Sequence, residues 1–202
     1  MFRQRIVLFF GAMLSAATCP VQGQPIANQP VPANLAVPSG NTAFLKASAS
    51  GSQNYVCLPS GTGLQWKFQG PQATLFVKFR WMNGEVRQQV TTHFLSPNPA
   101  ESGLARATWQ SSIDTSTVWA KKVAESNDPA FVTPGAIPWL LLQTAGTADG
   151  PMGGSFLSQT TYIQRVNTIG GNVASQDCTE AGALQFVPYT TDYIFYRASG
   201  SR

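Results

Sequence analysis

The sequence predicts an all-β fold, a single-domain antiparallel β-sandwich or barrel-like fold with long loops and little helix. Short runs of alternating apolar and polar residues have the period of two that is typical of half-buried strands. Charged residues make up only 11% of the 202-residue chain, whereas Thr, Ser, Gln, Asn and Gly are abundant. This composition favours strands and turns over amphipathic helices.

The first residues predict an export signal. Arg3 and Arg5 precede an apolar run over 6–17, which is followed by small and polar residues. That run is too short to cross a bilayer, so we expect a cleaved signal peptide and a secreted protein, periplasmic or extracellular. The chain then divides into a signal peptide, a proline-rich extended lead-in and a single β-rich domain, over 1–23, 24–40 and 41–202. A lipid-modified Cys19 is the alternative.

The cysteine count predicts one disulfide. Cys19 lies in the segment that is removed, which leaves Cys57 and Cys178 as a pair in the mature chain. Closing a loop of this length contributes about 4 to 5 kcal/mol to stability in the chain-entropy model. A cross-linked pair is not available as a nucleophile or a metal ligand.

The clearest strand signal is a hairpin. Residues 73–81 and 85–94 flank Asn83-Gly84, a dipeptide that suits the positive backbone dihedrals of a tight turn. Shorter strands are expected before it, at 53–58 and 64–68. The prolines, serines and glycine of 95–108 predict a long surface loop, the kind of segment that often carries a binding surface.

Further strands are expected in the second half of the chain, at 107–110, 115–121, 137–144, 155–167 and 189–197. The segment 122–134 is expected to be irregular. The run 137–144 is apolar on both alternating faces, so we place it in the centre of the sheet system.

Charge and composition exclude several classes of function. The formal net charge of +4 falls to about +2 without Arg3 and Arg5, and the basic residues do not cluster apart from Lys121 and Lys122. We therefore expect no nucleic-acid partner. One histidine and a paired set of cysteines cannot make the usual zinc shell, so no metal and no cofactor are expected. The mature chain has no apolar run of membrane-spanning length, so it is not expected to be an integral membrane protein.

His93 is the first catalytic candidate because it is the only histidine and hence the default general base. Strand alternation over 86–94 places it on a polar face with Arg87 and Gln89, at the entrance to the following loop. A hydrolase would add Ser112 and Asp114, yet the sequence holds no Gly-x-Ser-x-Gly elbow. The alternative role of His93 is to hold the loop by hydrogen bonding.

Aromatic residues are the candidates for binding. Trp109 and Trp119 lie near the expected middle loop, where an exposed indole can stack on a sugar ring or enter a partner's pocket. Packing is the favoured role for both residues, as it is for the other tryptophans. The remaining tryptophans, Trp66, Trp81 and Trp139, lie within strand patterns and are expected in the core.

Six blocks of sequence carry a family resemblance: PANL (32–35), QNYVC (53–57), THF (92–94), IPWLLL (137–142), IQRVNTIGG (163–171) and YTTDYIFY (189–196). They resemble the blocks of a family of exported bacterial and fungal proteins catalogued as domain of unknown function 3455. The resemblance implies export and a compact β-rich domain, and it brings no established activity. The chain departs from the family after His93, where FLSP (94–97) replaces a Gly-Pro loop, and at IDTS (113–116), which replaces an Asp-Gly-Ser segment.

These observations favour a binding or structural module of the cell envelope or extracellular space over an enzyme. A glycan or an envelope component is the expected kind of partner. The alternative function is a small secreted hydrolase that uses His93 as its general base.

Overall fold

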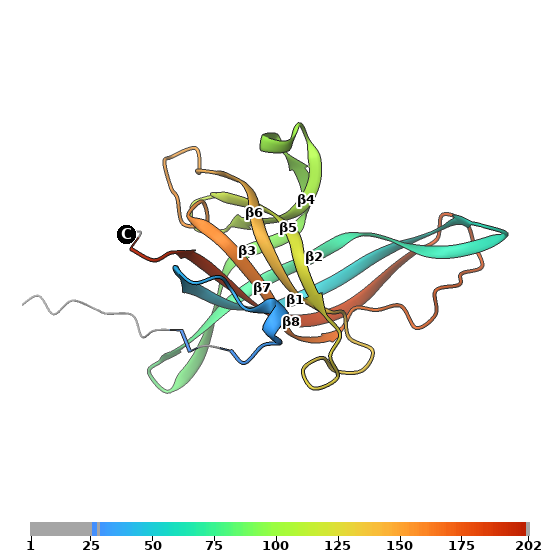
Figure 1. Cartoon of the computed structure of the whole chain (residues 1–202), viewed down its shortest axis with the longest axis horizontal. Helices are drawn as coiled ribbons and strands as arrows, with labels where there is room; N and C mark the ends of the chain where they lie inside the picture. The colour runs from blue at the N-terminus through green and yellow to red at the C-terminus, as the bar shows by residue number, and fades with distance from the viewer. Residues whose placement is uncertain (1–25, 28, 201–202) are drawn as a thin grey trace, which may run out of the picture.

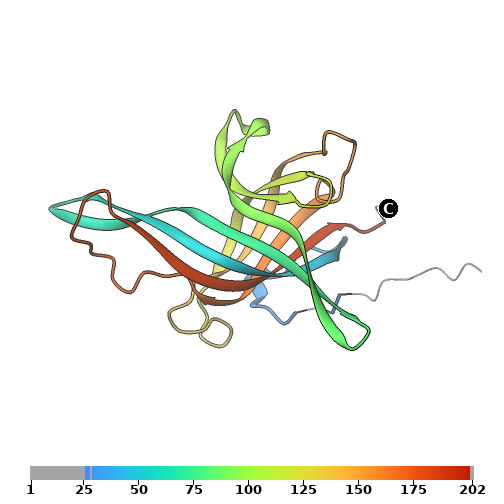
Figure 2. The ribbon, with the colours of Figure 1, turned by 180° about the vertical axis from the view of Figure 1, so that it is seen from behind.

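The computed structural model describes residues 26, 27 and 29–200 and shows a closed barrel of eight antiparallel strands (Figures 1 and 2). Each strand pairs with the next one along the chain, and β8 pairs with β1 to close the barrel. The strands are β1 (Asn41–Ser60), β2 (Gly63–Trp81), β3 (Gly84–Asn98), β4 (Leu104–Ser111), β5 (Thr117–Ser126), β6 (Trp139–Ala148), β7 (Thr160–Gly170) and β8 (Leu184–Ala198). The all-β, barrel-like prediction is confirmed.

Helical structure in the described residues is limited to two short 3-10 turns, η1 (Ala33–Leu35) and η2 (Pro99–Glu101). No helix in this part of the chain has the length and apolar character needed to cross a membrane. The predicted signal peptide over 1–23, including Cys19, lies outside the described residues.

The predicted hairpin is present, but its turn lies one residue earlier than expected. Trp81 pairs with Gly84, so the loop is Met82-Asn83, with Met82 at a φ of 51°. The cause is a β-bulge, because Leu75 faces Thr91 whereas Phe76 faces Gln89, which leaves one extra residue in β3. The bulge shifts the pairing of the whole tip.

The long loop predicted over 95–108 is wrong. Strand β3 continues to Asn98 and β4 begins at Leu104, so a five-residue connection joins them. The fully buried Asn98 organises this connection, since its side chain accepts the Ala100 N–H and donates to the carbonyl of Ala145. Residues that favour a loop by composition here form a compact capped turn.

The lead-in covers the outside of the barrel. Leu35 is fully buried with Trp139, Leu141 and Val166 in a cluster on the outer faces of β6 and β7. Gln164 anchors it by donating to the carbonyl of Leu35 at 2.7 Å. This cover explains why the run 137–144 is apolar on both faces.

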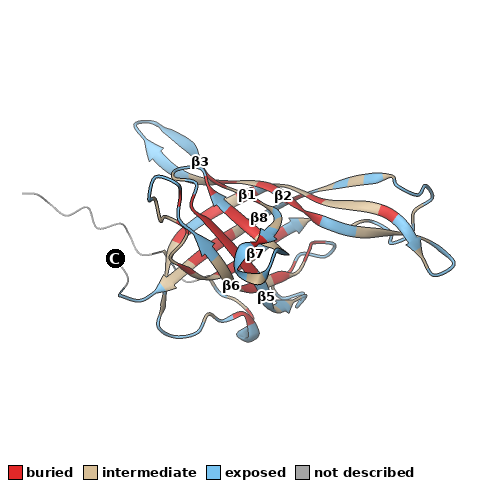
Figure 3. Ribbon diagram, turned by 90° about the horizontal axis from the view of Figure 1, so that it is seen from above, coloured by how far each residue is buried: buried red, intermediate tan, exposed pale blue. Residues whose placement is uncertain are grey.

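Inside the barrel, one end is plugged by side chains of the main core. Figure 3 shows buried residues along the strands of the barrel body, whereas the tips of the projecting arms are exposed. Phe44 packs edge-on against Phe156, with ring centroids 6.1 Å apart, and contacts Phe195 at 6.4 Å. Leu157 is fully buried beside them, and its N–H donates to the hydroxyl of Ser116. The β6–β7 loop and the β4–β5 turn therefore close this end, which we call the plugged end.

The predicted disulfide joins Cys57 to Cys178 across 121 residues, with the Cα atoms 6.0 Å apart. Cys57 also exchanges backbone hydrogen bonds with Gly182 and Ala183. The segment 171–183 therefore runs beside the long β1–β2 arm, at the opposite end of the barrel from the plug (Figure 1).

Candidate functional site

The end of the barrel opposite the plug, which we call the mouth, contains a cavity of about 230 Å³. Apolar and aromatic side chains form most of its wall. The polar side chains that line it are Gln53, His93, Arg106, Lys121, Lys122 and Arg165, and none of the lining residues is Asp or Glu. A second hollow of about 270 Å³ shares Gln53, Phe68 and Arg165 with it and opens toward solvent.

Cross-strand register brings the wall residues together from all eight strands. Trp109 of β4 pairs with His93 of β3, and Arg165 of β7 pairs with Tyr193 of β8. Directly opposed residues share a face of the sheet, so each pair enters the barrel together. Gln53 of β1 supplies a further polar group to the cavity. These residues are far apart in the sequence.

His93 lies inside the barrel, not on the predicted polar face with Arg87 and Gln89. The bulge at Val90 breaks the alternation of β3, so Thr91 and His93 point inward and are buried. The His93 ring stacks on Trp109 with centroids 4.1 Å apart and an interplanar angle of 8°.

The His93 imidazole is neutral. Burial, opposed by the hydrogen bond to Thr108 and reinforced by the Arg165 charge, lowers its pKa from 6.5 to about 3. Its Nδ1 lies 2.9 Å from the carbonyl oxygen of Thr108, and because a carbonyl only accepts, Nδ1 carries the proton. A group with this pKa is a weak base at neutral pH.

Arg165 brings a positive charge to the mouth. Its Nε and Nη2 donate to the carbonyl oxygen of Pro138 at 3.1 and 2.9 Å. Among the described residues no carboxylate forms an ion pair with it. Its charge opposes the rise in pKa that burial causes in Tyr55 and Tyr193, so both phenols lie within its field.

Two N–H donors at the mouth have no hydrogen-bond partner within the described part of the chain. They are Gln53 Nε2 and Trp109 Nε1, and their residues are only 3% and 1% exposed. A buried donor without a partner costs about 1–3 kcal/mol. A third such donor, Trp139 Nε1, belongs to the outer cluster under the lead-in.

Gly171 lets the rim of the mouth close over Gln53. A Cβ at this position would lie 2.8 Å from Ile137 and 3.2 Å from both Gln53 and Tyr189, and the residue has a φ of 92°. Its carbonyl accepts a hydrogen bond from the Tyr55 hydroxyl at 2.9 Å. Gly171 therefore lets the backbone pass close to Gln53, which lines the cavity.

The other two hydrolase candidates lie away from the mouth. Asp114 accepts hydrogen bonds from the Ser116 hydroxyl at 2.7 Å and the Phe156 N–H at 2.8 Å, which holds the plug in place. Desolvation would raise the pKa of Asp114, but these hydrogen bonds outweigh it and lower the pKa to about 2. Ser112 accepts from Gln89. No hydrogen bond among the described residues joins His93 to Asp114 or Ser112.

The burial of two tryptophans agrees with the favoured packing role, and a third tryptophan differs from expectation. Trp109 and Trp119 are buried, at 1% and 9% exposure, so neither is a surface platform, whereas Trp81, expected in the core, is 62% exposed. Trp119 lies outside the barrel and donates to the Ser96 hydroxyl at 2.9 Å. Trp109 remains a binding candidate because it lines the cavity.

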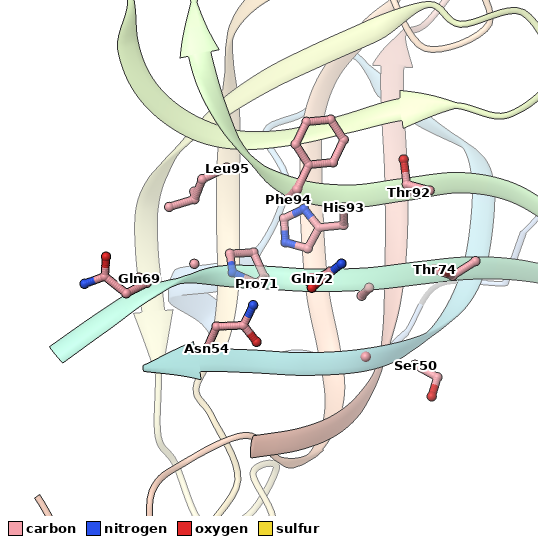
Figure 4. A pocket seen from close by; sticks show the side chains of 13 residues that line it. Ser50, Asn54, Gln69, Pro71, Gln72, Thr74, Thr92, His93, Phe94 and Leu95 are labelled. Carbon is pink, nitrogen blue, oxygen red and sulfur yellow. The ribbon is translucent and has the colours of Figure 1, made fainter. Parts of the chain in front are cut away.

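A larger hollow of about 580 Å³ lies over β1, β2 and β3 (Figure 4). Its lining side chains are amides, hydroxyls, apolar groups and the neutral His93 imidazole: Ser50, Asn54, Gln69, Pro71, Gln72, Thr74, Thr92, His93, Phe94 and Leu95. Pro71, His93 and Leu95 also line the mouth cavity. We call the larger hollow the outer groove. It is more open than the mouth cavity and lacks buried donors without partners.

Within the described part of the chain, no three His, Cys, Asp or Glu side chains come together where a metal ion would bind. Sequence reasoning missed Gln53, Arg165 and Tyr193 as site residues. A local signal existed for Arg165, since it stands two positions after Ile163 and thus on the same face as a core residue.

Comparison with known families finds one match. The family described as "Protein of unknown function (DUF3455)" matches residues 38–197. Neither the curated proteins nor the solved structures contain a match to the chain.

Proposed function

Because the chain belongs to the DUF3455 family, whose description assigns no activity, we propose a function from the site alone: the barrel mouth binds a small organic carboxylate with an apolar body. One observation carries this proposal. Arg165, without a carboxylate partner in the described chain, lines the cavity with Gln53 and Trp109, whose Nε2 and Nε1 donors are buried and have no hydrogen-bond partner in the described residues.

The three groups define the charge of the ligand. A guanidinium and two N–H groups are all donors, and a carboxylate is acceptor-only. Charge-assisted hydrogen bonds are about twice as strong as neutral ones, and they are strongest where water is excluded. A carboxylate would therefore satisfy Gln53 and Trp109 and neutralise Arg165 in one step.

The walls define the rest of the ligand. Trp109, Tyr193 and Leu140 present apolar surface to the cavity, which suits a ring or a short hydrocarbon body. The volume of about 230 Å³ is below the ~300–1,000 Å³ typical of drug-sized ligands. We therefore expect a ligand of the size of benzoate or phenylacetate.

Calorimetric titration of the oxidised protein with benzoate, phenylacetate and their neutral amides tests the proposal. We expect the carboxylates to bind at least tenfold more tightly than the amides, and Arg165→Met to reduce carboxylate binding by at least tenfold. Arg197→Met is the matched control, because Arg197 packs over Phe44 at the plugged end. Equal binding of acid and amide, or unchanged binding by Arg165→Met, contradicts the proposal.

A binding module outside the cytoplasm fits this site better than a hydrolase does. The disulfide is compatible with a secreted protein. The weak basicity of His93 and its hydrogen bond to Thr108 support a role in shaping the cavity. Hydrolysis of small esters that is abolished by His93→Gln, with binding retained, would favour the hydrolase instead.

The outer groove supports a second candidate, a neutral glycan. Its uncharged amides and hydroxyls, together with Phe94, are the groups that bind sugar hydroxyls and sugar faces. Titration with soluble neutral oligosaccharides should then show binding that Gln72→Ala weakens and Arg165→Met leaves unchanged. Absence of binding to these oligosaccharides removes this candidate without affecting the mouth.

A further inference from the structure

The tip of the β2–β3 hairpin extends from the barrel as a two-stranded ribbon (Figures 1 and 2). The ribbon leaves the barrel beyond Leu75 and Val77, two inward residues that pack in or against the main core. From Lys78 through Arg87 every residue is exposed. The ribbon therefore projects from the plugged end, and the mouth lies at the other end.

One face of this ribbon is apolar. Phe79 pairs directly with Val86, and Trp81 lies two residues further along on the same face. Phe79, Val86 and Trp81 are 44%, 37% and 62% exposed, and Met82 at the turn is 87% exposed. This face continues the inward face of β2 past the end of the barrel, where no described residue buries it.

The opposite face is basic. Lys78 pairs with Arg87, and Arg80 pairs with Glu85. Glu85 also lies 3.3 Å from Lys78. Three cations and one anion give the ribbon a net charge of +2. The ribbon is thus amphipathic, with a cationic face and an apolar face that ends in an exposed Trp-Met tip.

This arrangement distinguishes the ribbon from the other exposed arm. The β1–β2 arm carries the exposed Leu58 and Phe68, but β8 pairs along it and the disulfide ties it to 171–183. No third strand accompanies the β2–β3 ribbon past Gln89, since the β3–β4 ladder ends at Thr91 and Ser111. The apolar face of the β2–β3 ribbon is therefore exposed, and an external surface can cover it.

The charge of the ribbon indicates which kind of surface it contacts. A second copy of the chain would bring two ribbons of net charge +2 together, which is unfavourable. An anionic bilayer attracts Lys and Arg, each of which contributes about fivefold to binding near the surface, and Trp and Phe favour the interfacial region. A two-stranded ribbon with both features matches an anionic lipid surface.

We propose that the β2–β3 ribbon docks the protein on an anionic lipid bilayer, with Trp81 and Met82 inserted at the level of the headgroups. The barrel is then attached by its plugged end, and the mouth faces the solution. This peripheral attachment does not depend on the ligand proposed for the mouth, because it uses no residue of the cavity.

Co-sedimentation with vesicles of phosphatidylcholine, with and without phosphatidylglycerol, tests the proposal. We expect binding only to the anionic vesicles and a decrease with added salt. The Trp81→Ser/Met82→Ser double variant should bind at least tenfold more weakly. Arg80→Glu/Arg87→Glu reverses the charge of the basic face and should abolish binding. The exposed tip tolerates these changes because its side chains support no core packing.

Leu184→Ser is the matched control, since Leu184 is 63% exposed and lies at the start of β8, on the arm at the mouth end and away from the ribbon. It should leave vesicle binding unchanged. Retained binding by the Trp81→Ser/Met82→Ser variant overturns the proposal, as does equal binding to neutral and anionic vesicles. Sedimentation equilibrium tests whether a second copy of the chain contacts the ribbon instead. A dimer that Trp81→Ser dissociates would assign the ribbon to a second copy and would also overturn the bilayer proposal.

Discussion

The two ends of the barrel are built from the same eight strands but are filled differently. At the plugged end Phe44, Phe156 and Leu157 pack together, and Asp114 satisfies the backbone of the plug with its own hydrogen bonds. At the mouth, Arg165 has no carboxylate partner among the described residues, and Gln53 keeps an amide N–H unpaired at 3% exposure. The polar groups at the plugged end have hydrogen-bond partners, whereas the mouth contains buried N–H donors without partners in the described residues.

This difference separates residues that stabilise the barrel from residues that are available for binding. Buried donors without partners lower stability, so an arrangement that served packing alone would replace them by apolar groups. Two residues with such donors, Gln53 and Trp109, line one cavity at one end of the barrel. This indicates that a ligand with hydrogen-bond acceptors would bind at the mouth. Three measurements sharpen or break this comparison.

The largest expected effect is a loss of stability in acid caused by His93, which lines the mouth cavity. The pKa of His93 falls from 6.5 in the unfolded chain to about 3 in the folded protein. Between these values the unfolded state is protonated and the folded state is not, so lowering the pH favours unfolding. The contribution of His93 to the free energy of unfolding is complete above pH 6.5. It decreases as the pH falls, by about 4 to 5 kcal/mol at pH 3.

Urea unfolding of wild type and His93→Phe across this pH range measures the effect. Phenylalanine keeps a ring against Trp109 and removes the titration, so the pH dependence over this window should shrink by the amount that His93 contributes. Asp114, with its pKa lowered to about 2, acts mainly below pH 4 and is the same in both proteins. Equal slopes in both proteins would mean that the imidazole takes up a proton within the fold.

The next effect contrasts a leucine from each end. Leu157 is fully buried in the plug, so Leu157→Ala should lower the free energy of unfolding by about 3 kcal/mol through lost burial and a new void. Leu140→Ala at the mouth only enlarges an existing cavity and should cost about 1 kcal/mol. Denaturant unfolding at neutral pH compares them. Equal losses would show that the mouth is packed as tightly as the plug.

The smallest effect belongs to Arg165. Arg165→Met removes two hydrogen bonds to the Pro138 carbonyl but also removes a charge held without a carboxylate partner in the described chain. These changes oppose each other, so thermal unfolding without ligand should give a stability within about 1 kcal/mol of wild type. A loss of several kcal/mol would make Arg165 a structural residue and would remove the distinction between the two ends.

Local sequence patterns predicted much of the fold. The period of two located parts of all eight strands, and the hairpin around Asn83-Gly84 was correct apart from its turn. The segment 95–108 failed because composition cannot separate a long loop from two strands joined by a capped turn. Only the burial of Asn98 against the carbonyl of Ala145 makes that connection compact.

The site was less accessible to sequence reasoning. His93 was singled out by its chemistry, but its face was wrong, because a one-residue bulge at Val90 reverses the alternation on which that prediction depended. Trp109 was named as a binding candidate with packing as its favoured role, and it is buried in the wall of the cavity. Gln53 and Arg165 lie within the family blocks QNYVC and IQRVNTIGG, but no local pattern marks them as site residues, and only the fold brings them to one cavity.

The sequence by itself determined that the chain forms a β-rich fold and that Cys57 pairs with Cys178, because strand periodicity and cysteine number are local or countable properties. The tertiary structure decided that the sheet closes into a barrel, that one end is plugged and that the other presents unpaired donors. Those properties depend on register and on bulges, where a shift of one residue changes which side chains face the interior. The mouth exists only after all eight strands have come together.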